Sequence, residues 1–207
     1  MKKIDLKKEL KYLYVPSPKE VVAVEVPKFN FLMIDGKGDP DTSQEFQNAV
    51  EALYSVSYTL KFTIKKEDAI DYPVMPLEGL WWMKDMKAFD WQKKDEWRWT
   101  MMIMQPKYVT AAKMKQALKA VSEKKDLPAL PLVRFEAFDE GLSVQVLHIG
   151  PYAAEAPTII RMHDFASAQG YELHGKHHEI YLGDPRKSAP EKLKTGLRQP
   201  VRKQKKG

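Results

Sequence analysis

The sequence predicts an α+β fold made of two units that repeat the order strand, helix, strand, strand. Stretches in which apolar and polar residues alternate are typical of half-buried strands, and stretches with apolar residues three and four apart are typical of helices. Turns that contain Gly and Pro separate these stretches. The same order recurs in both halves of the 207-residue chain, which is long enough to bury a large core.

The first unit begins with residues 20 to 40, where the alternation ends in Gly and Pro and predicts a strand and a turn. The polar residues just after this turn offer a cap for a helix, and apolar residues at helical spacing continue to about Ile64. Residues 74 to 85 and 96 to 106 are rich in aromatic and apolar side chains and predict the next two strands.

A further helix is expected between the units, over residues 108 to 125, because Ala, Met and Leu recur there at helical spacing. Two short strands follow it, and we expect a hairpin turn between them at residues 139 to 141. Residues 156 to 170 predict the helix of the second unit, with Pro157 in its first turn and Gly170 at its end.

The last part of the chain predicts two more strands. We expect one strand over residues 170 to 185 and then a short helix over residues 189 to 197. Residues 198 to 201 predict a closing strand at the edge of the sheet, because Pro200 cannot donate a ladder hydrogen bond.

Both units belong to one predicted domain, residues 20 to 202, which follows an N-terminal extension over residues 1 to 19 and precedes a basic tail over residues 203 to 207. The stretches LMIDGKGDP and VLHIGPYAAEAP take equivalent places before the helices of the two units. Repeated units of this kind are expected to join their sheets across a pseudo-two-fold axis, with a cleft between them.

Positive charge is concentrated at the C-terminal end of the chain. Arg202, Lys203, Lys205 and Lys206 supply four charges, and without them the net charge falls from +6 to +2. Basic chain ends are usually solvated, and no nucleic-acid-binding motif accompanies this one. We therefore expect no specific nucleic-acid partner.

The composition excludes several kinds of site. The chain has no cysteine, which excludes disulfides, thiolate metal sites and cysteine nucleophiles. The GKG at residues 36 to 38 lacks the spacing of a nucleotide-binding loop. His177 and His178 point to opposite faces of a strand, which argues against a metal site. We expect no cofactor and no metal.

The chain also lacks an apolar run near the roughly 20 residues that a membrane span needs. Its first residues, MKKIDLKKELKYLY, contain no apolar core of an export signal. We expect a cytoplasmic protein without a membrane partner, and the sequence leaves its oligomeric state open.

Large apolar residues are expected on the sheet face that the helices leave uncovered, and they would line the cleft. An exposed face of this kind promotes aggregation unless it binds a ligand. An aromatic cup with one carboxylate suits flat, hydrophobic or cationic molecules. The residues assigned to this face are Trp81, Trp82, Trp97, Trp99, Met101, Tyr181 and Glu179, with His148 at the cleft mouth.

Alternatives to this ligand face stay open at this point. Aromatic residues dominate ordinary cores, so the tryptophans can be core residues, and Glu179 can form a structural ion pair. His148 can instead serve the turn at the end of its strand. Which of Trp81 and Trp82 faces inward is also open, because Pro76 and Gly79 can shift the phase of the strand.

The HIGPY turn before a helix and the stretch HEIYLGDPRKSAPEKLKTGLRQPV resemble the GyrI-like small-molecule-binding family. The resemblance covers residues 20 to 202. The family includes the effector domains of multidrug-sensing transcription activators. It implies that Glu179, through its E-x-Y context, is the acidic residue at the floor of the ligand pocket. It also implies that Tyr152 lies at the rim of that pocket.

Some free-standing members that the chain resembles are cyclopropanoid cyclopropyl hydrolases, which open the reactive ring of DNA-alkylating compounds with water. The resemblance then implies that Glu179, with a pKa raised by its aromatic surroundings, is the general base and that Tyr152 donates to the developing phenolate. Two other functions remain open. One is a drug-sequestering or sensing protein without turnover, and the other is a protein-binding inhibitor like the gyrase-inhibiting relatives.

Overall fold

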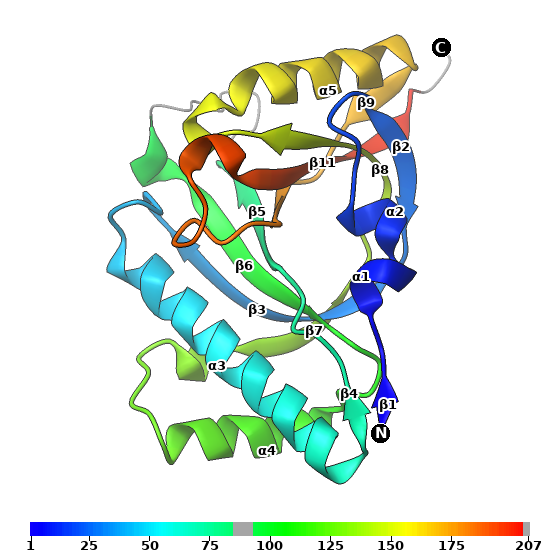
Figure 1. The fold of residues 1–207 in the computed structure, drawn as a ribbon. Coiled ribbons are helices and arrows are strands. Elements are labelled where there is room, and N and C mark those ends of the chain that lie inside the picture. Colours follow the sequence, from blue (N-terminus) through cyan, green and yellow to red (C-terminus); the bar gives the residue numbers. More distant parts are fainter. Residues whose placement is uncertain (85–92, 205–207) are drawn as a thin grey trace. The chain divides into compact units, whose positions relative to one another are not determined.

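The structure is a computed structural model that describes residues 1–84 and 93–204 (Figure 1). The chain divides into two compact units. Unit 1 comprises Met1–Glu9 and Phe29–Phe138, and unit 2 comprises Leu10–Lys28 and Asp139–Gly207. Among the helices that the structure describes, none combines the length and the apolar character that crossing a membrane requires.

Unit 1 is built on an antiparallel sheet with the strand order β5-β6-β3-β7, and a short parallel pair, β1 with β4, lies apart from that sheet. Helix α3 contacts β3 and β6, and α4 contacts α3. The elements of unit 1 are β1 (Lys2–Lys3), α1 (Leu6–Glu9), β3 (Phe29–Lys37), α3 (Gln44–Glu67), β4 (Ile70–Asp71), β5 (Leu77–Trp82), η2 (Lys94–Glu96), β6 (Arg98–Gln105), α4 (Ala111–Ser122), η3 (Leu130–Leu132) and β7 (Arg134–Phe138).

Helix α3 confirms the sequence prediction for residues 41 to 64 and shows why the helix begins there. The Ser43 hydroxyl accepts a hydrogen bond from the backbone N–H of Phe46 at 3.2 Å, which satisfies one of the free N–H groups at the helix start. Leu53, Leu60 and Ile64 recur at helical spacing and are fully buried. Burial of this stripe against the sheet holds the helix in place.

Unit 2 is built on an antiparallel sheet with the strand order β2-β8-β11-β10, and β9 also pairs with β11. Its core forms where α5 packs on the sheet, with Ile159, Met162 and Ala166 against residues such as Val146 and Leu197. The elements of unit 2 are α2 (Lys11–Tyr14), β2 (Val22–Val26), β8 (Gly141–Ile149), η4 (Tyr152–Ala154), α5 (Ala156–Ala168), β9 (Tyr171–Leu173), β10 (His177–Tyr181), η5 (Pro190–Lys192) and β11 (Lys194–Lys203).

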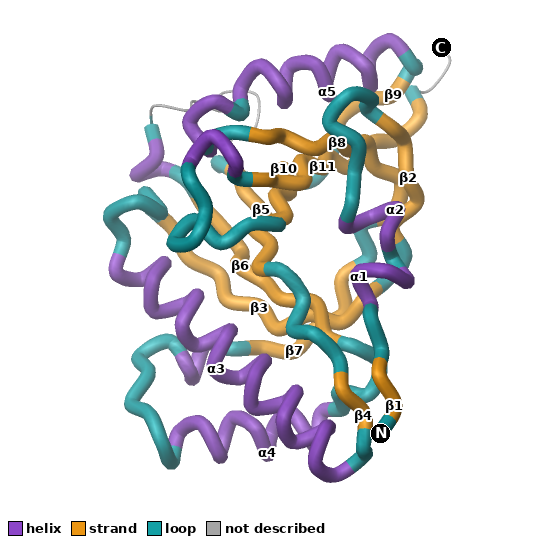
Figure 2. Tube along the Cα trace, in the orientation of Figure 1, coloured by secondary structure: helices purple, strands orange, loops and turns teal. Residues whose placement is uncertain are grey.

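The predicted repeat is confirmed by the order of the strands (Figure 2). In unit 1, the segment β3-α3-β5-β6 places its strands in the order β5-β6-β3. In unit 2, the segment β8-α5-β10-β11 places its strands in the same order, β10-β11-β8. Each unit adds one strand next to the first strand of this segment, β7 in unit 1 and β2 in unit 2. The α+β class predicted from the sequence is therefore correct.

The predicted hairpin at residues 139 to 141 is wrong. Strand β7 before this turn pairs with β3, whereas β8 after it pairs with β2 and β11. The turn itself exists, since Gly141 has a positive φ of 68°. A local turn signal shows that the chain bends but does not determine which strands pair beyond the bend.

The C-terminal segment also differs from its prediction. The short helix is only the 3₁₀ turn η5, and β11 begins at Lys194 and lies between β8 and β10 instead of at an edge. On one side of β11, Pro200 pairs with Ser143 of β8. On the other side, β10 pairs with β11 as far as Arg198, and β9 pairs with it from Val201 onward, so Pro200 lies in the gap between these two strands. Because the ladder is interrupted there, the missing N–H of proline costs little.

Candidate functional site

Strand β10 carries Glu179 on the same face as two other polar side chains. The Tyr181 hydroxyl donates a hydrogen bond to Glu179 Oε2 at 2.8 Å, and His177 Nε2 lies 3.5 Å from Glu179 Oε1. The alternation of a strand places all three side chains on one face, as the sequence predicted for Glu179 and Tyr181. Glu179 is only partly buried, with 12% of its side chain exposed.

Tyr152, in the 3₁₀ turn η4, joins this group. Its ring packs edge-to-face on the ring of Tyr181, with the centroids 5.7 Å apart and the planes at 78°. Tyr152 is 39% exposed, so part of the residue remains in contact with solvent. The structure therefore brings Glu179 and Tyr152, which the resemblance selected, into one cluster through Tyr181.

The cluster contains a second carboxyl group, which the sequence analysis missed. Glu155 follows η4 directly, is only 3% exposed, and lies within hydrogen-bonding reach of Glu179. Burial, the largest cause, and the negative charge of Glu179 together raise the pKa of Glu155 to about 9, while the nearby Thr195 hydroxyl acts in the opposite direction. Within the described residues, Glu155 Oε1 and Thr195 Oγ1 are buried without a hydrogen-bond partner.

His148, predicted at the cleft mouth, is 6% exposed and uses both ring nitrogens inside the protein. Its Nδ1 lies 2.9 Å from Thr158 Oγ1, and its Nε2 lies 3.3 Å from the carbonyl oxygen of Pro151. Burial lowers the pKa of His148, although Glu179 opposes the shift. These contacts brace the turn that presents Tyr152. Gly150 in that turn has a φ of 144°, which side chains rarely adopt, and a Cβ there would lie 3.1 Å from the imidazole Nε2 of His148.

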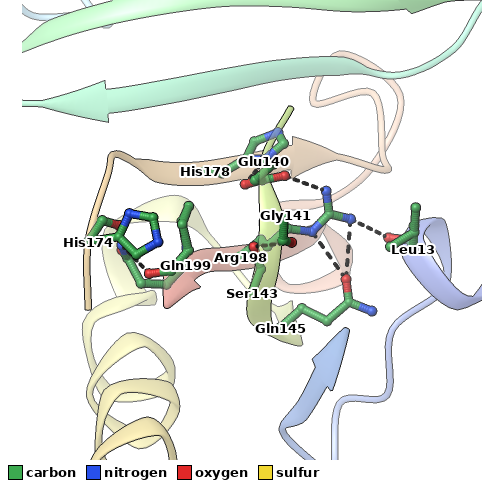
Figure 3. Close-up of polar contacts among 10 residues, drawn as sticks. Leu13, Glu140, Gly141, Ser143, Gln145, His174, His178, Arg198 and Gln199 are labelled. Carbon is green, nitrogen blue, oxygen red and sulfur yellow. Dashed lines mark hydrogen bonds and ion pairs between the residues drawn. The ribbon is translucent and has the colours of Figure 1, made fainter. Parts of the chain in front are cut away.

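The opposite face of β10 has a different character (Figure 3). His178 Nδ1 lies 2.9 Å from Glu140 Oε1, and Arg198 Nη1 donates to Glu140 Oε2 at 3.1 Å. Arg198 also donates to the side chain of Gln145 at 3.2 Å and to the backbone carbonyl of Leu13 at 3.0 Å. This network, the Glu140–Arg198 network, is fully buried and links α2 to three strands. It leaves His178 engaged away from Glu179.

The predicted tryptophans lie in unit 1, and three of them form an aromatic cluster around Phe46 of α3. Trp81 stacks on Phe46 with the ring centroids 6.2 Å apart, and Trp99 meets Phe46 edge-to-face at 5.3 Å. Trp97 packs on Trp81 at 5.7 Å. Trp81 and Trp99 are at most 3% exposed, as expected of core residues.

Met101 is also fully buried, and Trp82 and Trp97 are half-buried. Trp82 follows Trp81 along β5 and so points to the other face of that strand. The role of the five unit 1 residues in ligand binding stays a prediction.

Glu155 could not have been singled out from the sequence. It stands in the quoted stretch GPYAAEAP, but a Glu at the start of a helix is common, since a carboxylate there interacts favourably with the helix dipole. Its distinguishing property is burial beside Glu179, and this depends on pairing between distant segments. Within residues 1–84 and 93–204, no group of three or more His, Asp and Glu side chains is placed to hold a metal ion.

A model of the GyrI-like small molecule binding domain matches residues 19–202. The chain belongs to the GyrI-like family. No curated protein matches the chain significantly.

Solved structures from Listeria innocua are similar to this GyrI-like chain over nearly its whole length. A conserved protein of uncharacterized function is 42% identical, with a TM-score of 0.89, and the match covers 96% of this chain and 100% of that one. A hydrolase is 42% identical, with a TM-score of 0.87 and coverages of 97% and 100%. The C-terminal domain of EcmrR, at 14% identity, a TM-score of 0.55 and coverages of 89% and 98%, shares the fold.

Proposed function

We propose that this GyrI-like protein binds flat, hydrophobic or cationic small molecules at the Glu179 cluster and hydrolyses compounds that carry a strained, electrophilic cyclopropane. The observation that carries the proposal is the Glu179 carboxylate, held by the Tyr181 hydroxyl beside the exposed ring of Tyr152. The similarity to a Listeria innocua hydrolase at 42% identity over 97% of the chain supports hydrolysis.

The chemistry requires a base and a proton donor. Glu179 takes a proton from water while the water oxygen bonds to a cyclopropane carbon. The carbon–carbon bond of the ring breaks, and its electron pair moves to the conjugated carbonyl oxygen of the substrate. That oxygen becomes a phenolate and takes a proton from the Tyr152 hydroxyl. Glu179 then releases its proton to the solvent, and the solvent returns one to Tyr152, so that both residues regain their starting states. The product is the substrate plus one water.

Aromatic rings provide the binding surface in this proposal. Tyr152 and Tyr181 present an edge-to-face pair beside the carboxylate, an arrangement that favours aromatic and cationic groups.

Turnover of a cyclopropane-bearing alkylating compound tests the proposal. The protein is incubated far below the compound concentration, and the absorbance and the product mass are followed. We expect a water adduct over many turnovers and a loss of about a hundredfold or more in Glu179→Gln, the usual contribution of a general base. Glu20→Gln, which removes an exposed carboxylate of the same unit, is the control and should keep full activity.

Two outcomes would overturn hydrolysis. Tryptophan or tyrosine quenching by the compound without turnover leaves a binding protein in which Glu179 is a recognition charge. Full activity in Glu179→Gln would remove the residue from the mechanism.

A further inference from the structure

Two carboxyl groups in contact within a buried site cannot both be ionised without strong repulsion. Glu155 and Glu179 form such a pair, since their side chains lie within hydrogen-bonding reach. A hydrogen bond between two carboxyl groups needs one proton, because a carboxylate can only accept. The geometry therefore raises the question of which carboxyl carries that proton.

The surroundings assign the negative charge to Glu179. It accepts a hydrogen bond from the Tyr181 hydroxyl of the same strand, has His177 Nε2 at 3.5 Å, and keeps 12% of its side chain exposed. Both a donated hydrogen bond and solvent stabilise the ionised form.

The surroundings of Glu155 favour the neutral form. The residue is 3% exposed, and its Oε1 has no hydrogen-bond partner within the described part of the chain. The groups that act on it are the Glu179 carboxylate of β10 and the Thr195 hydroxyl of β11. His148 of β8 acts on Glu179 and has a lowered pKa, so it brings no positive charge at neutral pH.

We propose that Glu155 is a positioning residue that stays protonated and donates a hydrogen bond from its carboxyl group to the Glu179 carboxylate. The pair then carries a single negative charge, held on the oxygen atoms of Glu179. Two donors, the Glu155 carboxyl and the Tyr181 hydroxyl, fix the orientation of that carboxylate. The raised pKa of Glu155, about 9, agrees with this assignment.

The kinetic test of this inference rests on the proposed hydrolysis. Two substitutions of Glu155 separate the effect of its donated hydrogen bond from the effect of its ionisation. Glu155→Gln keeps a donor to Glu179 but cannot ionise. We expect its kcat at neutral pH to stay within about threefold of the parent value, since the hydrogen bond is retained. Glu155→Ala removes the donor, and we expect a loss of about ten- to a hundredfold, typical of a hydrogen bond to a charged group.

The pH profile gives a readout that a purely structural role would not move. In the parent protein, activity should fall as the pH rises through about 9, where Glu155 ionises and stops donating. Glu155→Gln should lack this alkaline decline. A Glu155→Gln variant as impaired as Glu155→Ala, or one with an unchanged alkaline decline, would overturn the proposal.

A second measurement does not depend on turnover. The infrared spectrum of the protein at neutral pH should contain the carbonyl band of a protonated carboxylic acid, and the difference spectrum against Glu155→Gln should show its loss. Glu20→Gln should retain the band. If the band is unchanged in Glu155→Gln, the pair does not hold its proton on Glu155, even if hydrolysis is found. If the band behaves as expected but no substrate turns over, only the proposed hydrolysis fails.

Discussion

Glu140 and Glu155 are two buried carboxyl groups of unit 2 with opposite electrostatic properties. They are similarly shielded from solvent, at 7% and 3% exposed. Burial raises the pKa of both. At Glu140 the attraction and hydrogen bonds of His178 and Arg198 outweigh burial and hold the pKa at about 2. At Glu155 the neighbouring charge is the negative charge of Glu179, and the pKa rises to about 9.

The comparison shows that the partners of a buried carboxyl group, rather than its burial, decide its role. Glu140 lies in a network in which both of its oxygens are bonded and Arg198 reaches Gln145 and Leu13 as well. Such a network holds elements together. Glu155 keeps an oxygen without a bond among the described residues, which is a property expected of a functional group.

The largest effect is expected when the Glu140–Arg198 network loses its cation. Arg198→Met keeps much of the side-chain volume but leaves Glu140 buried with one partner fewer. Breaking a buried ion pair in this way typically lowers the free energy of unfolding by about 3–5 kcal/mol. Urea denaturation at neutral pH measures the change.

The same strand supplies a control for this substitution. Arg202 of β11 pairs with Glu172 at 2.9 Å, but its side chain is 63% exposed. Exposed pairs contribute about 1 kcal/mol or less, so Arg202→Met should change the free energy of unfolding only slightly. Equal losses in the two variants would contradict a special role for the buried network.

An intermediate effect is expected on the pH dependence of stability. Glu155 binds its proton more tightly in the folded state, with a pKa near 9, than in the unfolded state, with an ordinary pKa of 4.5. Its contribution to stability is therefore complete below about pH 4.5, declines as the pH rises, and is lost above about pH 9. The slope is at most about 1.4 kcal/mol per pH unit.

Glu155→Gln cannot ionise and should lack this slope. The stability of the variant relative to the parent should increase between about pH 6 and pH 8, as followed by urea denaturation at several pH values. Glu20→Gln should run parallel to the parent protein. Parallel curves for the parent and Glu155→Gln would mean that Glu155 is ionised in the folded protein.

The sequence predicted those parts of the fold that depend on local pattern. The helical spacing that continues to about Ile64 and the polar cap residues just before it identify α3, because both signals are local to the helix. Alternation likewise placed Glu179 and Tyr181 on one face of β10. The resemblance added Tyr152, which packs on Tyr181.

Features that depend on pairing between distant segments were not predictable. The position of β11 in the middle of a sheet, and the tolerance of Pro200 there, follow from where β10 pairing ends and β9 pairing begins. Glu155 joins the Glu179 cluster only because β10 and β11 bring Glu179 and Thr195 next to the start of α5. Phe46 belongs to the apolar positions of α3, but its contact with two tryptophans follows from the packing of α3 against the strands that carry them.

The smallest effect is expected at Tyr181, whose hydroxyl gives Glu179 a neutral donor where Glu140 has a cation. Tyr181→Phe removes the 2.8 Å hydrogen bond but keeps the ring that packs on Tyr152. Loss of one such bond should lower the free energy of unfolding by about 0.5–1.5 kcal/mol, because Glu179 is partly exposed and water replaces the donor. Tyr12→Phe, at an exposed tyrosine, should change stability by less than about 0.5 kcal/mol. A loss in Tyr181→Phe as large as that in Arg198→Met would mean that the charge of Glu179, like that of Glu140, is structural. The contrast between the Glu140–Arg198 network and the cluster around Glu155 and Glu179 would then fail.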